Sequence, residues 1–185
     1  MRVVNKDEFR LEKTEFFDAI LDGAIFIHAT DTIYGLGCDA TNKEAVARLR
    51  KIKEKDKQPF PIIAPNKEWI IENMDVKEKD LEKLPGPFTI IADIKNKDCI
   101  ADNVNPLGNN TLGIRIPDHW FSMVVSMLGV PIVTTSVNKG GGAYMKQIED
   151  LSSQLKKDID FAIYDGPIEG SPSEIINLSK GKIYK

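Results

Sequence analysis

The part of the chain best suited to chemistry is residues 29–40, where hydroxyls, a carboxylate and glycines follow an apolar run. The run itself, residues 24–27, is typical of a buried strand, and Thr-Asp-Thr follows at positions 30–32. Open α/β sheets bind ligands at the ends of their strands, and Gly35 and Gly37 would let the backbone turn or approach a ligand closely. The pattern therefore predicts a ligand-binding loop, with an ordinary polar loop as the alternative.

Two further segments, 112–119 and 131–142, have the same design of an apolar strand followed by small polar residues. If the three strand ends converge, they bring together hydroxyls, an amide and a guanidinium: Thr30, Thr32, Tyr34, Arg115, Ser136 and Asn138. This set contains no obvious general base, so it suits the binding and positioning of anions. Arg115 lies inside an apolar strand and needs a partner there, either a carboxylate or a ligand anion.

Four lysines occupy alternate positions at the end of a helix predicted for residues 43–53 and just beyond it: Lys51, Lys53, Lys55 and Lys57. They could bind anions, or they could form a solvated helix end in which lysines favour the helix dipole. The glycine run at 140–142 could cradle a phosphate through backbone N–H groups or act as a flexible turn. The chain lacks the pattern GxxxxGK[ST], so a P-loop is not expected.

The composition is that of an ordinary globular chain. Its 185 residues suffice for one domain with a substantial core, and the net charge of −3 gives no global signal for nucleic-acid binding. Two cysteines (Cys38 and Cys99) and two histidines (His28 and His119) are too few and too scattered to suggest a disulfide framework or a metal site. The N-terminus lacks a signal-peptide pattern and no run approaches the roughly 20 apolar residues of a membrane span. A reduced, cytoplasmic location without a membrane partner is expected.

The elements that must position the polar residues can be predicted from periodicity and capping residues. Helices are predicted at 14–22, 43–53, 66–74, 76–84, from 117 onward and at 145–156, with Thr14 and Asn42 capping the first two. Strands are predicted at 24–28, 59–64, 88–94, 112–116, 130–134, 161–164 and twice near the C-terminus. The polar stretch 95–110 is expected to be functional or mobile. Because helices and strands mix without strict alternation, residues 1–185 are predicted to form a single α/β domain with a twisted, mixed sheet and flanking helices.

Five motifs in this chain together resemble those of the YrdC/TsaC family of threonylcarbamoyl-AMP synthases. The family patterns and their positions here are P-T-D-T-x-Y-G-L-G-x-D-A at 29–40, P-G-P-x-T at 85–89, G-x-R-x-P at 113–117, T-S-A-N at 135–138 and P-S-T-[IV] at 172–175. They occur in the family's order and span most of the chain. The resemblance implies a YrdC-like fold with a concave, positively charged cavity.

The resemblance also implies a reaction and its partners. The amine of L-threonine takes up bicarbonate or CO2 to give a carbamate, whose oxygen attacks the α-phosphate of ATP. Threonylcarbamoyl-AMP and pyrophosphate result, and the product serves the modification of adenosine 37 in tRNA. Mg²⁺ would accompany ATP, with no metal ligands expected from the chain itself. The tRNA and a tRNA threonylcarbamoyl transferase are the further partners that the family implies.

Carried onto this sequence, the resemblance assigns roles to eight residues and a supporting one. Lys53 and Lys55 would bind substrate carboxylate and phosphate oxygens, and with Ser136 and Asn138 they form the expected catalytic set. The threonine pocket would be lined by Thr30, Thr32 and Tyr34. ATP and the transferred group would contact Arg115, Ser136 and Asn138. Ser173 would support the nucleotide.

Several positions depart from the family patterns. Ala29 replaces a proline, the K-x-R pair reads Lys53-Glu54-Lys55, and Glu174 replaces a threonine. Lysine cannot reproduce the bidentate fork of an arginine. A second hypothesis is therefore a paralogue of the same fold that binds RNA or nucleotide without the synthesis. A third is a carbamoyl-phosphate-using transferase partner, although family members with that role usually carry zinc-finger-like cysteines in a longer chain.

Overall fold

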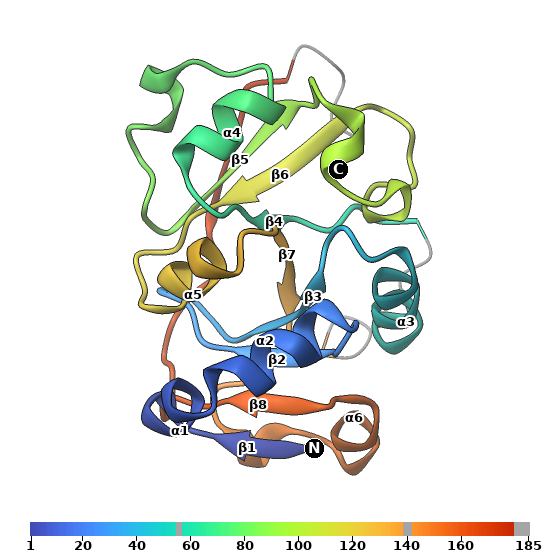
Figure 1. The fold of residues 1–185 in the computed structure, drawn as a ribbon, viewed down its shortest axis with the longest axis vertical. Coiled ribbons are helices and arrows are strands. Elements are labelled where there is room, and N and C mark those ends of the chain that lie inside the picture. The colour runs from blue at the N-terminus through green and yellow to red at the C-terminus, as the bar shows by residue number, and fades with distance from the viewer. Residues whose placement is uncertain (55–56, 139–141, 180–185) are drawn as a thin grey trace.

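The computed structural model describes residues 1–54, 57–138 and 142–179. Over these residues the chain forms a nine-stranded sheet with helices packed against it (Figure 1). The strands are β1 (Arg2–Val4), β2 (Phe26–His28), β3 (Gly35–Asp39), β4 (Ile62–Ile63), β5 (Phe88–Asp93), β6 (Thr111–Arg115), β7 (Ile132–Ser136), β8 (Phe161–Ile163) and β9 (Glu174–Asn177). The α-helices are α1 (Lys6–Leu11), α2 (Lys13–Leu21), α3 (Lys43–Lys53), α4 (Lys67–Asn73), α5 (Phe121–Leu128) and α6 (Ser153–Asp158). The 3-10 helices are η1 (Glu78–Leu81), η2 (Lys97–Cys99), η3 (Asp102–Val104) and η4 (Ile148–Asp150).

The sheet is mixed, with the strand order β1-β8-β2-β3-β7-β4-β6-β5-β9. Strand β8 runs parallel to β1 and β2, β4 parallel to β6, and β5 parallel to β9, whereas β3 and β7 pair only with antiparallel neighbours. The predicted α/β class with a mixed sheet and flanking helices is confirmed. Because β8 and β9 lie near opposite ends of the sheet, residues 164–173 between them, here called the connector, run along the length of the molecule (Figure 1).

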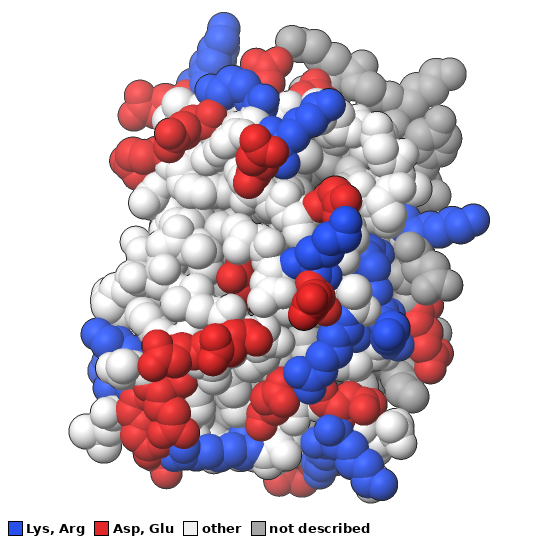
Figure 2. Space-filling view, turned by 45° about the vertical axis from the view of Figure 1, so that its right-hand side comes forward, with Lys and Arg blue, Asp and Glu red and all other residues white. Residues whose placement is uncertain are grey.

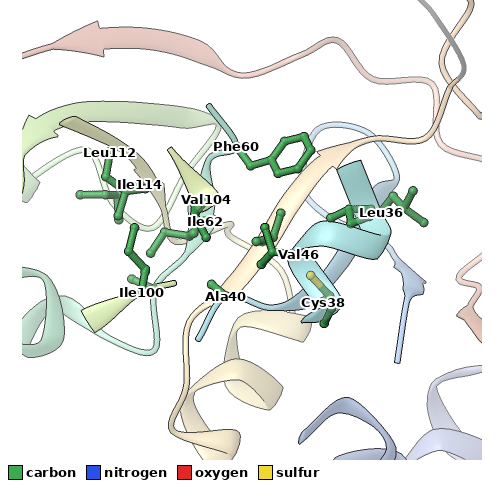
Figure 3. Close-up of a cluster of buried hydrophobic side chains, with 14 of the residues drawn as sticks. Leu36, Cys38, Ala40, Val46, Phe60, Ile62, Ile100, Val104, Leu112 and Ile114 are labelled. Carbon is green, nitrogen blue, oxygen red and sulfur yellow. The ribbon is translucent and has the colours of Figure 1, made fainter. Parts of the chain in front are cut away.

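Both faces of the central strands are buried. In β4, Ile62 belongs to one hydrophobic cluster and Ile63 to another, because successive side chains of a strand point to opposite faces. Figure 3 shows part of the first cluster, where side chains of α3, β3, β4 and β6 gather. The second is rich in aromatic rings, with Phe26 stacked on Phe161 at 5.2 Å and 6.0 Å from Phe121 of α5. This double burial explains the continuous apolar runs in the sequence.

The N-terminal segment contains two elements that the sequence analysis does not predict, β1 and α1. Helix α1 begins with a capping box, in which the Asn5 side chain accepts the N–H of Glu8 and the Glu8 carboxylate accepts the N–H of Asn5. That Asn-x-x-Glu pattern was the available signal. The next helix also needs a correction, because α2 begins at Lys13 after Glu12, which places Thr14 inside the first turn and not at the cap. The predicted cap of α3 is confirmed, since the Asn42 side chain accepts two backbone N–H groups.

Two predicted helices are shorter than expected. The region 76–84 forms only the short 3-10 helix η1, and the region 145–156 divides into η4 and α6. The division has a local cause, because Ser152 has extended backbone angles and caps α6 by accepting the N–H of Leu155 at 3.2 Å. Within the described ranges, no helix is long and apolar enough to cross a membrane.

Residues 35–39 form a buried strand, which corrects the prediction that this whole stretch is a loop. Strand β3 pairs antiparallel with β2, and Gly35 lies opposite His28. A Cβ atom on Gly35 would lie only 2.5 Å from Cε1 of His28 and 2.7 Å from Oγ1 of Thr134. The glycine therefore makes room for neighbouring side chains in the sheet. Only residues 29–34 remain as the polar turn between β2 and β3.

The polar stretch 95–110 is anchored to the rest of the protein. It contains η2 and η3, and its apolar residues Ile100 and Val104 are buried in the first cluster. The Nδ2 of Asn105 donates to the backbone oxygen of Thr111 at 2.6 Å, which fixes the return into β6. This packing accounts for the stretch without requiring a ligand.

Candidate active site

The three predicted strand ends converge, as their shared design suggests. Arg115, the last residue of β6, donates from Nη1 to Oγ1 of Thr32 at 3.0 Å and from Nη2 to Oδ1 of Asp31 at 2.7 Å. Both partners belong to the turn after β2. On the other side of that turn, Gly35 of β3 lies opposite Ser136 of β7. The ends of β2, β6 and β7 and the start of β3 thus lie close together.

A pocket of about 190 Å³ opens at this meeting point. It is lined by Ile33, Tyr34, Gly35, Pro61, Thr89, Arg115, Thr134, Thr135, Ser136, Tyr144, Pro172 and Ser173. Hydroxyl groups and one guanidinium dominate its polar lining, which suits the oxygens of an anionic ligand. Arg115 supplies the positive charge among these lining residues, so the strongly basic cavity implied by the resemblance stays a prediction.

Arg115 is held in a buried ion pair, so its predicted need for a partner is met by a carboxylate. Its side chain is 7% exposed and that of Asp31 is 10% exposed. Burial lowers the pKa of Arg115, and the neighbouring Asp31 carboxylate opposes that shift. The second oxygen of Asp31 accepts the N–H of Asp118 at 2.9 Å. The Nε of Arg115 is also buried, yet it has no hydrogen-bond partner among the described residues.

Lys53 is buried, which rules out the solvated-helix-end interpretation for this lysine. It is 1% exposed, and its Nζ donates to the backbone oxygens of Ser136 at 2.5 Å and Asn138 at 2.8 Å. A third bond reaches Oδ1 of Asn138 at 2.6 Å. Lysine has three N–H donors, so the ammonium holds together the backbone that leaves β7. Lys55 lies outside the described residues.

Ser136 and Asn138 form a small network around this ammonium. The Ser136 hydroxyl donates to Oδ1 of Asn138 at 2.9 Å, and Nδ2 of Asn138 donates to the backbone oxygen of Gly142 at 2.8 Å. The amide oxygen of Asn138 therefore accepts hydrogen bonds from Lys53 and Ser136, and its amide nitrogen donates to the chain beyond β7. Of the glycine run proposed as a phosphate cradle, residues 140 and 141 lie outside the described residues.

The two predicted threonines have roles within the turn. The Thr30 hydroxyl donates to the backbone oxygen of Ile33 at 2.7 Å and accepts the N–H of Thr32 at 3.1 Å. Thr32 contacts Arg115, and both threonines are almost fully buried. Neither is among the residues that line the pocket, whereas Tyr34 is. The threonines thus shape the turn that positions Arg115 and Tyr34.

Tyr34 is a fixed wall of the pocket. Its hydroxyl donates to the backbone oxygen of Gly166 at 2.6 Å and accepts the N–H of Asp165 at 3.0 Å, both in the connector. Its ring stacks on Tyr164 at 5.7 Å. Burial raises the pKa of Tyr34, so the phenol stays neutral. The connector packs closely against the turn. A Cβ atom on Gly170 would lie only 1.6 Å from the backbone oxygen of Thr32.

Ser173 lies in the pocket lining, as proposed, and is 2.7 Å from Thr89 through their hydroxyl oxygens. Thr89 is not among the predicted site residues, although it belongs to the motif at 85–89. Thr134 and Thr135 beside Ser136 are not among them either, although the run of three hydroxyls is a signal in the sequence. Tyr144 has no signal of this kind, since it stands alone in an irregular segment.

The two histidines lie near the site without lining it. His28 is fully buried, and desolvation lowers its pKa to about 3, so the ring is neutral. Its Nε2 has no hydrogen-bond partner among the described residues. His119 accepts the N–H of Phe121 through Nδ1 at 3.2 Å, and its Nε2 lies 3.2 Å from the Asp165 carboxylate. In the described part of the chain, no group of three or more His, Cys, Asp or Glu could hold a metal ion.

Known proteins are similar to this chain in sequence and in fold. Residues 18–184 match the sequence profile of a family designated Sua5_yciO_yrdC and described as "Telomere recombination". A protein of Methanocaldococcus jannaschii, provisionally named a threonylcarbamoyl-AMP synthase, is 35% identical over 184 residues, covering 96% of this chain and 86% of that protein. A protein of Pseudoalteromonas translucida, named threonylcarbamoyl-AMP synthase, is 26% identical over 174 residues, covering 90% of this chain and 92% of that protein.

Among solved structures, that of P. abyssi Sua5 complexed with L-threonine superimposes with a TM-score of 0.83 at 22% identity. The match covers 96% of this chain and 54% of that one, so this chain spans about half the length of that Sua5 protein. At this identity the likeness concerns the fold. The nine-stranded sheet around the pocket is therefore a shared architecture.

Proposed function

Because the chain belongs to the Sua5/YciO/YrdC family, we propose that it synthesises threonylcarbamoyl-AMP from L-threonine, bicarbonate or CO2 and ATP, releasing pyrophosphate. The observation that carries this proposal is the convergence of family motifs from four strands on one polar pocket, with Arg115 in its lining and the Lys53 ammonium behind Ser136. The named synthase relatives over nearly the whole chain support it.

The reaction asks little covalent chemistry of the protein. Threonine supplies the nitrogen that takes up CO2, and the resulting carbamate oxygen forms a bond to the α-phosphorus of ATP. The bond from that phosphorus to the bridging β-phosphate oxygen breaks, and pyrophosphate leaves. The enzyme must bring two anions together and offset their charge. A pocket lined by hydroxyls and the Arg115 guanidinium, with the buried Lys53 ammonium bonded to the backbone of Ser136, suits this task.

We assign the cationic role first to Arg115. Its two Nη groups are engaged by the turn, whereas the Nε–H is a buried donor with no partner among the described residues. A buried donor without an acceptor is costly, and a substrate oxygen that reached this atom would remove that cost. The Asp31 contact fixes the guanidinium plane, so this donor is oriented before the substrate arrives.

We assign Lys53 a role that requires an exchange of partners. Its three donors meet protein oxygens, one of them the side-chain oxygen of Asn138. A carboxylate or phosphate oxygen that replaced Oδ1 of Asn138 would gain a charge-assisted bond and leave the two backbone bonds in place. Ser136 donates to the same Oδ1, and this bond orients it in the pocket lining.

The remaining assignments concern residues that form or shape the walls of the pocket. Tyr34 would form the wall of the pocket beside the bound threonine, and Thr30 and Thr32 would act by shaping the turn that positions it. The wall beside the nucleotide would be formed by Ser173 and Thr89. Lys55 is proposed as a further phosphate contact on the strength of the resemblance alone. Mg²⁺ would enter the site with ATP, as part of the substrate.

We further propose a cytoplasmic role in tRNA modification, with a tRNA threonylcarbamoyl transferase as recipient of the product. On the face shown in Figure 2, basic and acidic side chains are interspersed. Among the described residues of that face, the basic side chains do not form the continuous positive surface that drives binding to a phosphate backbone. Transfer of the product through a partner protein is therefore favoured over tight tRNA binding by that surface.

The direct test is pyrophosphate release by the purified protein with Mg-ATP, L-threonine and bicarbonate, omitting each in turn. Mass spectrometry would follow threonylcarbamoyl-AMP. We expect release only with all three substrates, together with the adenylate. A folded protein that gives no product beside an active control synthase would contradict the proposal and favour the paralogue that binds RNA or nucleotide, which tRNA and ATP titrations would then examine.

A further inference from the structure

The pocket has a buried floor and an exposed mouth. Arg115 and Thr134 are each 6% exposed and form part of the floor. At the mouth, Tyr144 is 43% exposed and Pro172 is also exposed. The floor therefore offers polar groups to charged atoms, while the mouth offers an aromatic ring and an apolar surface. A ligand that fits both has a flat apolar part and an anionic part.

The backbone is held in place on both sides of Tyr144. The N–H of Met145 donates to the backbone oxygen of Val137 at 3.1 Å, and Met145 itself is 3% exposed. On the other side, Asn138 holds the backbone oxygen of Gly142. The backbone is fixed beside the end of β7, yet the ring remains half exposed. Core packing does not explain an aromatic ring in this position.

We propose that Tyr144 is the stacking platform for the purine base of the nucleotide substrate. The inference rests on the proposed function and adds a binding residue that lies outside all five sequence motifs. With the base on the Tyr144 ring at the mouth, the phosphates extend toward Arg115 and Ser136 at the floor. Aromatic stacking uses the flat face that every base possesses. Tyr144 consequently contributes affinity for the nucleoside part and little selectivity among bases.

The kinetic test compares Tyr144→Ala, Tyr144→Phe and Tyr144→Trp with the wild type. Tyr144→Ala should raise KM for ATP by about tenfold, the size expected for one stacked base, and leave KM for threonine within about twofold. Phe and Trp should retain the wild-type KM for ATP, because both keep an aromatic face. The control is Met127→Ala, which alters an exposed apolar residue on α5 and should change neither KM. An unchanged KM for ATP in Tyr144→Ala would overturn the inference.

A binding measurement separates this inference from the proposed function. Mg-ATP and inorganic tripolyphosphate, which lacks a base, are titrated calorimetrically into the wild type and Tyr144→Ala without threonine. The expected result is weaker ATP binding by the variant with unchanged tripolyphosphate binding. That result would support the stacking role even if the protein made no adenylate, in which case only the proposed reaction fails. Equal loss for both ligands, or no ATP binding by the wild type, would refute the stacking role.

Discussion

Lys53 and Asn138 are joined by two hydrogen bonds, from the Nζ of Lys53 to the backbone oxygen of Asn138 at 2.8 Å and to its side-chain oxygen at 2.6 Å. The lysine ends α3 and the asparagine follows β7, 85 positions later in the chain. A buried ammonium is thereby stabilised in part by hydrogen bonding to an amide oxygen that is not charged. A substrate oxyanion is a stronger partner for an ammonium than an amide, so this bond can be exchanged on binding.

Lys53→Ala should lower threonylcarbamoyl-AMP synthesis more than tenfold, about 1.4 kcal/mol or more of transition-state stabilisation. Lys53→Met, which keeps most of the side-chain volume, should show the same loss and separate charge from packing. Lys51→Ala serves as the control because that lysine is exposed on the same helix. Initial rates of pyrophosphate release are compared, with circular dichroism to verify folding. Normal rates in a folded Lys53→Met protein would remove Lys53 from the site.

Ser136→Ala should also lower synthesis more than tenfold, because the hydroxyl lines the pocket and is oriented by Asn138. The protein should stay folded, since Ser136 is only half-buried. Ser152→Ala is a matched control that removes the cap of α6 and leaves the pocket intact. It should reduce the melting temperature and preserve the rate. If both variants kept the wild-type rate, the assignment of Ser136 would be wrong.

Asp31→Ala should destabilise the fold by roughly 3–5 kcal/mol, because it leaves the Arg115 charge buried without its partner. Urea denaturation measures the free energy of unfolding. The double variant Asp31→Ala with Arg115→Met should recover much of the loss, since no unpaired charge remains. Asp102→Ala, which breaks an exposed pair with Lys43, should leave the free energy of unfolding almost unchanged. Similar small effects from both single substitutions would contradict the buried-pair interpretation.

The pH dependence of stability should carry the signature of His28. Its pKa is about 3 in the folded protein and 6.5 without burial. Between these values the unfolded chain binds a proton at His28 and the folded chain does not, so lowering the pH favours unfolding. The expected loss from this group is on the order of 2–3 kcal/mol between about pH 7 and about pH 4.5. Urea denaturation at both pH values measures it, with His28→Leu as the variant that cannot titrate. Equal losses in wild type and variant would show that His28 is not the group responsible.

Much of the site was predictable because its signals are local. The hydroxyls at 30–32 and at Ser136 follow apolar runs, and Arg115 stands out in a strand as a charge that needs a partner. Each of these observations uses a few neighbouring positions. The Asn42 cap is local in the same way, and the structure bears it out.

The remainder depends on partners that are distant in the chain. The lysines around Lys53 alternate like a solvated surface, and only the carbonyl oxygens 83 and 85 positions later show why one of them is buried. Strand β3 is hidden in the sequence because its glycines suggest a loop, although they make room for His28 and its neighbours across the sheet. Tyr144 belongs to no periodic sequence pattern, and only its position at the pocket mouth indicates a role in binding.

The connector also determines when the pocket can form during translation. A growing chain that has completed β7 already carries Lys53, Arg115 and Ser136. The hydroxyl of Tyr34 must still await Gly166, 132 positions later, and Thr89 must await Ser173, 84 positions later. These walls therefore cannot be complete before residue 173 has left the ribosome, because a shorter nascent chain lacks at least one of the two contacts that fix them.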